Sequence, residues 1–254
     1  MTPRAGSGLT YLLAGAVGLT TLTLLMPLAD TPGSQQIANI PAYVLVIVCV
    51  VPLLHGFLIT TQGYSTPYLL LFGAVAAGIG FMLAIRVRPE KLDDVPGILT
   101  SVTLSLADLC RILAAAAVGV SLARHIKSVG VALLVASAAT ASDLFSVFAG
   151  PTRTLVEDDS PVLDLLLLVF PTFGSVLGFG LGASDFVFLA LFAAASLFLS
   201  LRYPATLLYV CAGILLAVTT GLLLERPLPA VPFVAVAFVL ANADLILASL
   251  LKRA

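Results

Sequence analysis

Long apolar segments separated by short polar connections make up most of this chain. A helix of about 20 mostly apolar residues crosses a bilayer, because backbone polar groups cannot stay unpaired in hydrocarbon. By that criterion the pattern predicts about eight spans and an all-α polytopic membrane protein. The predicted spans are Leu9–Ala29, Ile40–Thr61, Pro67–Ile85, Leu99–Ala123, Ile126–Ala149, Gly178–Leu201, Tyr203–Leu224 and Pro229–Leu251.

One apolar segment is too short to cross the bilayer. It is Leu163–Phe170, which follows the acidic, proline-flanked connection Gly150–Pro161 and precedes the sixth predicted span. A length of this kind favours a short strand or an interfacial segment. We expect a single transmembrane domain over 1–254, with N-terminal helices in 1–125, a helix pair and its connection in 126–201, and C-terminal helices in 202–254.

Composition supports a membrane protein and excludes several other classes. Hydrophobic residues make up 60% of the chain and charged residues 10%, with a mean hydropathy of +1.15, whereas soluble domains carry about 25% charged residues. A formal net charge of −1 gives no basic surplus for a nucleic-acid partner. Cys49, Cys110 and Cys211 lie in apolar runs without disulfide or metal-ligand spacing, so we predict no metal and no cofactor.

The basic residues indicate an orientation. An even number of spans puts both termini on one side, and Lys252 and Arg253 favour the cytoplasm for that side. Arg124 and Lys127 would then also be cytoplasmic, in agreement with the positive-inside rule, whereas the basic residues of Arg86–Pro96 would lie outside. Few lysines and no cysteine pairing are compatible with a prokaryotic plasma membrane, which we expect, and an internal eukaryotic membrane stays the alternative.

Two aspartates lie inside predicted spans, where ionisable groups cost several kcal/mol. Asp143 comes late in the fifth span and Asp185 early in the sixth, so the two should lie at similar depth. Two carboxylates close together in a low dielectric share one proton, as in aspartic proteases, and titrate as a unit. The ionised group would take a proton from water, while the protonated group would polarise the scissile carbonyl.

The spacing of the aspartates leaves other functions open. Paired intramembrane aspartates also form proton or cation pathways, so a proton-coupled transporter using Asp143, Asp185 and Asp244 is the alternative. A non-catalytic membrane scaffold would make both aspartates dispensable. Asp108 and Arg111 lie on one helical face and are expected to neutralise each other.

Four short segments carry a resemblance to a known family. In chain order they are Asp143-Leu-Phe-Ser-Val-Phe148, Leu168-Val-Phe-Pro171, Gly182-Ala-Ser-Asp185 with the following Phe186-Val-Phe188, and Pro229-Ala-Val-Pro232. They resemble the motifs of the presenilin and signal peptide peptidase family of GxGD-type intramembrane aspartyl proteases. The chain departs from the family at Ser142, Ser184 and Val231, and has one predicted span fewer.

The resemblance implies a presenilin-like bundle in which Asp143 and Asp185 hydrolyse peptide bonds within transmembrane segments, such as remnant signal peptides. It also implies that the irregular start of the last span lies next to the aspartates, and that an extended substrate adds as a strand to the edge of Leu163–Phe170. The implied substrate-binding residues are Pro229, Ala230, Val231, Pro232, Leu168, Val169, Phe170 and Gly182. Gly174, Gly178 and Gly182 recur every four residues and predict close helix packing.

Overall fold

The computed structural model describes residues 5–28, 39–86, 98–150, 166–224, 226 and 228–251. These ranges contain nine α-helices, a short 3-10 helix and one two-stranded sheet. The chain forms two compact units, each built from two stretches of sequence. Unit 1 comprises Met1–Ala117 and Pro161–Ala183, and unit 2 comprises Val118–Ser160 and Ser184–Ala254.

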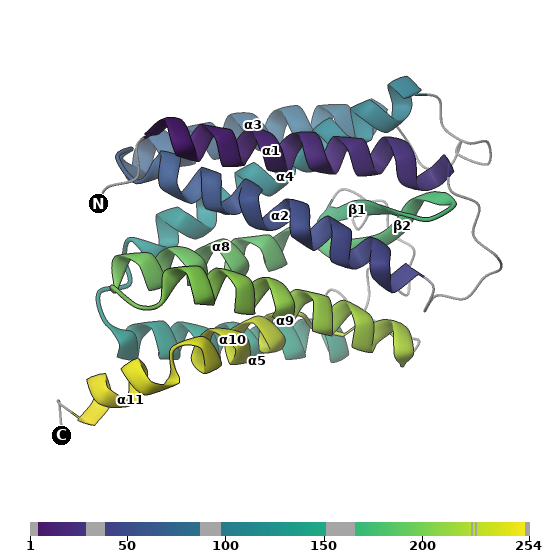
Figure 1. Cartoon of the computed structure of the whole chain (residues 1–254). Coiled ribbons are helices and arrows are strands. Elements are labelled where there is room, and N and C mark those ends of the chain that lie inside the picture. Colours follow the sequence, from purple (N-terminus) through teal and green to yellow (C-terminus); the bar gives the residue numbers. More distant parts are fainter. Residues whose placement is uncertain are drawn as a thin grey trace. The chain divides into compact units, whose positions relative to one another are not determined.

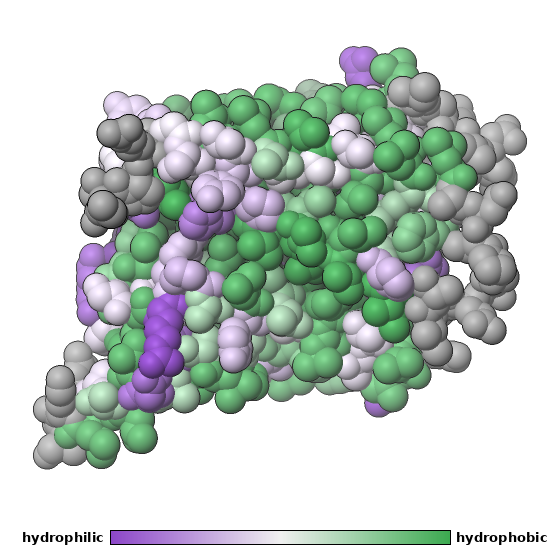
Figure 2. All heavy atoms as spheres, in the orientation of Figure 1, coloured by the Kyte–Doolittle hydropathy of each residue, from purple (hydrophilic) through white to green (hydrophobic). Residues whose placement is uncertain are grey.

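Six helices of the described chain are long and apolar enough to cross a membrane. They are α1 (Ala5–Leu25, continued by the 3-10 helix Met26–Leu28), α2 (Ile40–Thr61), α3 (Thr66–Arg86), α4 (Ile98–Ala123), α5 (Val129–Phe148) and α9 (Tyr203–Leu223). Hydrophobic residues cover most of the face drawn in Figure 2. The protein is therefore an integral, multi-pass membrane protein.

The prediction of eight spans is wrong by one or two. Helix α8 (Ala183–Phe198) has 16 residues, about 24 Å of helix against a hydrocarbon core of about 30 Å. Helices α10 (Val231–Ala241) and α11 (Ala243–Leu251) form one predicted span, but they are bent by 73° at Asn242. Counting this bent pair as a single span gives seven candidates.

Small residues bring the helices of unit 1 close together. Helix α1 runs alongside α2 (Figure 1), and a Cβ atom added at Gly56 would lie 2.3 Å from the Leu12 backbone nitrogen. A Cβ atom at Gly80 of α3 would lie 3.0 Å from the carbonyl oxygen of Ala107 in α4. Glycine permits these contacts because it has no side chain. Apolar helices in a bilayer associate mainly through such close backbone approach.

An antiparallel hairpin completes unit 1. Strand β1 (Leu167–Thr172) pairs with β2 (Ser175–Gly182), with Leu167 opposite Gly182 and Phe170 opposite Phe179. Gly174 forms the turn with φ of 76°, which favours glycine. The strand predicted at Leu163–Phe170 is confirmed from Leu167 onward, while residues 163–165 lie outside the described residues.

The hairpin also corrects two predictions. Residues 178–182 belong to β2 and not to a helix, so α8 begins five residues later than the predicted span. Gly174, Gly178 and Gly182 accordingly lie in a turn and a strand, and they form no helical packing ridge. The hairpin is held by Gly174 N–H, which donates to Met26 O at 3.1 Å, and by the edge-on contact of Tyr43 with Phe179.

Helix α8 forms the core of unit 2. Every residue from Leu189 to Ser196 is buried, and the Phe192 ring stacks on Phe238 of α10 with centroids 5.0 Å apart. A helix that is apolar on all sides belongs in such an interior position. Helix α10 also contacts α9 closely, since a Cβ atom at Gly213 would lie 2.8 Å from Phe233 O.

Polar groups join the break between α10 and α11 to the start of α9. Buried Asn242 accepts from Arg202 N–H at 3.0 Å and donates to Thr206 Oγ1 at 2.8 Å. Asp244 pairs with the Arg202 guanidinium at 2.5 Å, with both side chains more than half exposed. The bend therefore has a local cause, because Asn242 bonds to another helix end where α10 stops.

Candidate active site

Asp143 is bonded to the segment that opens α10. The residue stands near the end of α5, whose start is capped by Ser128, and its side chain is half-buried. Its Oδ2 atom accepts a hydrogen bond from the backbone N–H of Val231 at 3.0 Å. This contact joins two segments that are 88 residues apart in the chain.

The donor belongs to the segment Pro229-Ala-Val-Pro232. Val231 is the first residue of α10, and the first N–H groups of a helix have no partner within that helix. Pro232 at the second helical position lacks an N–H, so fewer donors compete for the carboxylate. Helix N-termini also favour negative charge. The start of α10 is therefore suited to hold the Asp143 side chain in a fixed position.

Asp185 is the third residue of α8 and lies in its first turn, where the helix dipole favours a carboxylate. Its side chain is half-buried, and Phe186 beside it is fully buried. Asp143, Asp185 and the segment Pro229–Pro232 all belong to unit 2. One compact unit thus contains both predicted catalytic residues and one of the predicted substrate-binding segments, while their roles stay predictions.

The remaining predicted substrate-binding residues lie in the hairpin of unit 1. Leu168 and Phe170 of β1 have buried side chains, Val169 is half-buried, and Gly182 ends β2. Helix α8 begins at the next residue, so the chain runs directly from β2 to Asp185.

The ion pair predicted between Asp108 and Arg111 is present and buried. It does more than neutralise two charges, because both side chains also bond to the backbone of β1. Sequence spacing could not predict this role, because Asp108 and β1 are far apart in the chain. The polar pair within an apolar helix was the only signal of it.

The other polar residues that the structure describes lead to no second catalytic site. His55 contacts the Tyr11 ring edge-on, with centroids 4.9 Å apart. Cys49, Cys110 and Cys211 are free thiols. Among the residues that the structure describes, no three potential metal ligands come together.

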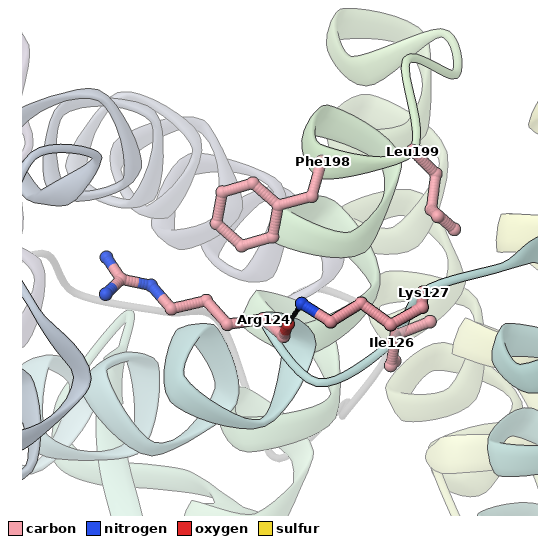
Figure 3. Close-up of a pocket in the computed structure, with 5 residues that line it drawn as sticks. All are labelled: Arg124, Ile126, Lys127, Phe198 and Leu199. Carbon is pink, nitrogen blue, oxygen red and sulfur yellow. Dashed lines mark hydrogen bonds between the residues drawn. The ribbon is translucent and has the colours of Figure 1, made fainter.

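A hollow of about 320 Å³ lies elsewhere in unit 2. It is lined by Arg124, Ile126, Lys127, Phe198 and Leu199 (Figure 3). Lys127 Nζ turns back to donate to Arg124 O at 2.7 Å. The lining contains no carboxyl, hydroxyl, thiol or imidazole side chain, so this hollow lacks an aspartyl dyad or a serine or cysteine nucleophile for peptide hydrolysis.

No known family model matches the chain. A search of curated protein sequences finds no match either. The candidate site therefore stands on the residues and contacts described above, and the resemblance of the four segments stays a prediction.

Proposed function

We propose that the protein is an intramembrane aspartyl protease in which Asp143 and Asp185 activate water to hydrolyse peptide bonds of transmembrane segments. The observation that carries the proposal is the hydrogen bond from Val231 N–H to Asp143 Oδ2. This bond links two of the four segments that resemble the presenilin and signal peptide peptidase family. The resemblance implies that the irregular start of the last span lies next to the aspartates.

The chemistry requires one ionised and one protonated carboxyl group. The ionised group removes a proton from water while the water oxygen attacks the scissile carbonyl, and the protonated group donates to the carbonyl oxygen. The Val231 N–H bond would fix one oxygen of Asp143 and so limit how this carboxyl group turns. The leaving amine takes a proton from the dyad when the carbon–nitrogen bond breaks.

The substrate class follows from the surroundings of the aspartates. Both lie in apolar helices of a multi-pass protein, so a substrate reaching them would be apolar along its length. A helical substrate hides its peptide bonds and must become extended before hydrolysis. The hairpin that leads directly to Asp185 is the element suited to hold an extended chain.

The test is cleavage of a reporter transmembrane peptide by the purified protein in liposomes. Wild type should cut, and Asp143→Asn and Asp185→Asn should each lose activity by roughly 10²-fold or more, because each removes a group that moves a proton. Asp244→Asn is the matched control, since its carboxylate pairs with Arg202 at an exposed position. Equal cutting by wild type and both variants would refute the dyad.

One observation favours the alternative of a proton-coupled transporter. Discontinuous helices are typical of transporter binding sites, and α10 and α11 are bent by 73° at their break. A transporter would show substrate-dependent proton uptake into liposomes that depends on Asp143, Asp185 and Asp244. Uptake without cleavage of any peptide would replace the protease proposal with this one.

A further inference from the structure

The basic hollow, as we call the hollow of about 320 Å³ in Figure 3, lies at the ends of three helices of unit 2. Helix α4 ends at Ala123 and α5 begins at Val129, and both helices are long and apolar enough to cross a membrane. Their connection therefore lies at a membrane surface. Helix α8 ends at Phe198, which lines the same hollow. The basic hollow is thus at the depth of lipid head groups.

Cations line one side of the basic hollow and apolar side chains line the other. Arg124 and Lys127 come from the connection between α4 and α5. Figure 3 shows Phe198 and Leu199 on the opposite side. Lys127 Nζ donates to Arg124 O at 2.7 Å, and its ammonium group, which carries three donors, can bond a further acceptor. Guanidinium and ammonium groups are the side chains that bind phosphate.

The lining of the basic hollow carries two positive charges and no negative one. Both candidate catalytic aspartates are far from it along their own helices. About 20 Å of α8 separates Asp185 from Phe198, and a similar length of α5 separates Val129 from Asp143. The basic hollow is therefore separate from the candidate active site.

The combination of cations and apolar side chains selects among phosphate-bearing ligands. A free phosphate ion would use only the cations, whereas an anionic phospholipid would also place its acyl chains beside Phe198, a large apolar side chain that is 38% exposed. Basic pockets between transmembrane helices typically bind anionic head groups. The basic hollow has a volume at the low end of the range of small-ligand sites, which is enough for a head group.

We propose that the basic hollow binds the head group of an anionic phospholipid. Arg124 and Lys127 contact the negatively charged head group. Phe198 and Leu199 contact the first carbons of the acyl chains. The inference does not depend on the proposed function, because the basic hollow lies at the other ends of α5 and α8 from the aspartates.

The first test compares phosphatidylglycerol with phosphatidylcholine of the same acyl chains. Each lipid is added to the purified full-length protein in detergent, and bound lipid is counted by native mass spectrometry. Each cation near an anionic head group strengthens binding roughly fivefold, so we expect phosphatidylglycerol to bind roughly 30-fold more tightly. Arg124→Gln/Lys127→Gln should remove this preference, while Arg124→Lys/Lys127→Arg should keep most of it. Equal phosphatidylglycerol affinity of wild type and the glutamine variant would overturn the inference.

Two controls separate the basic hollow from other sources of binding. Arg86 is an exposed basic residue at the end of α3 and does not line the hollow, so Arg86→Gln should bind phosphatidylglycerol like wild type. A loss as large as that of the double glutamine variant would mean diffuse attraction to surface charge and would overturn the inference. Inorganic phosphate in excess should not displace the lipid. Displacement by equimolar phosphate would assign the site to free phosphate and would likewise overturn it.

The second test uses wild type alone, so it decides the inference even if the glutamine variant does not fold. Wild type is placed in phosphatidylcholine vesicles that contain a minor fraction of phosphatidylglycerol with a photoreactive group at the start of one acyl chain. After illumination and digestion, we expect the label on Phe198 or Leu199, and unlabelled phosphatidylglycerol should compete with it. Label confined to other helices, or label that unlabelled phosphatidylglycerol does not reduce, would overturn the inference.

Discussion

At the residue scale, Ser200 has a backbone conformation that normally favours glycine. Its φ is 56°, and it follows α8 where Leu201 N–H donates to Ser196 O and Ser200 N–H donates to Leu197 O. This is the Schellman arrangement, in which the residue after the helix takes the left-handed conformation. The turn between α8 and α9 thus holds a local strain.

Replacing Ser200 with glycine should relieve that strain. We expect Ser200→Gly to stabilise the protein by about 1 kcal/mol, since a left-handed conformation costs an L-residue about 1–2 kcal/mol. Thermal unfolding in detergent measures the change. Ser200→Ala keeps the Cβ atom and should show no gain, and an equal gain in both variants would contradict this explanation.

A second residue-scale prediction separates the structural role of Asp143 from its chemistry. Asp143→Asn keeps an oxygen that can accept from Val231 N–H, whereas Asp143→Leu leaves this donor without its acceptor. We expect the leucine variant to be less stable than the asparagine variant by about 1–3 kcal/mol. Chemical denaturation of both variants measures the difference. Equal stabilities would mean that the Asp143–Val231 bond does not hold α5 and α10 together.

Sequence position predicts the two aspartates as candidate site residues, but it does not predict the partner of Asp143. Asp143 and Asp185 stand out in the sequence because a carboxylate in an apolar helix is costly. The partner of Asp143 cannot be found from spacing, because Val231 is 88 residues away and contributes only its backbone. Only the resemblance of Pro229–Pro232 to a family motif indicated that this segment would lie nearby.

At the element scale, the hairpin departs most from what the sequence predicts. The four-residue spacing of Gly174, Gly178 and Gly182 predicts a helical ridge, whereas the structure has a turn and a strand there. Glycines also alternate with larger apolar residues from Leu177 to Gly182, and this two-residue period is the signal of a strand. The short apolar length before Pro171 gave the first strand correctly, because it could not cross a bilayer.

The contact between α4 and α8 allows an element-scale prediction. A Cβ atom at Gly119 would lie 2.3 Å from the carbonyl oxygen of Val187, two residues after Asp185. We expect Gly119→Ala to push the helices apart, to destabilise the protein by about 1–3 kcal/mol and to lower cleavage. Thermal unfolding and the peptide assay measure the two effects.

Gly78→Ala is the control for this helix contact. No heavy atom lies within 4 Å of a Cβ atom added at Gly78, so alanine should be tolerated there. If Gly119→Ala is as stable and active as Gly78→Ala, close packing at Gly119 is not needed to position α8.

At the scale of the whole molecule, hydropathy predicted the class of protein and overcounted its spans. The Gly178–Leu201 segment is apolar enough to count as a span, but its first residues form β2 and its helix is the core of unit 2. Apolarity reports burial in protein as well as burial in lipid, so composition alone could not separate the two. Hydropathy likewise did not predict the break at Asn242, because the residues around it form an apolar run.

The proposed function requires Asp143 and Asp185 to act together on peptide bonds inside a membrane. The most direct measurement is mass spectrometry of the products formed from a transmembrane peptide by wild type, Asp143→Asn and Asp185→Asn in liposomes. We expect wild type to cut within the apolar segment of the peptide, and each variant to leave the peptide intact. A cut confined to the polar flanks, or the same products from either variant, would contradict the proposed function.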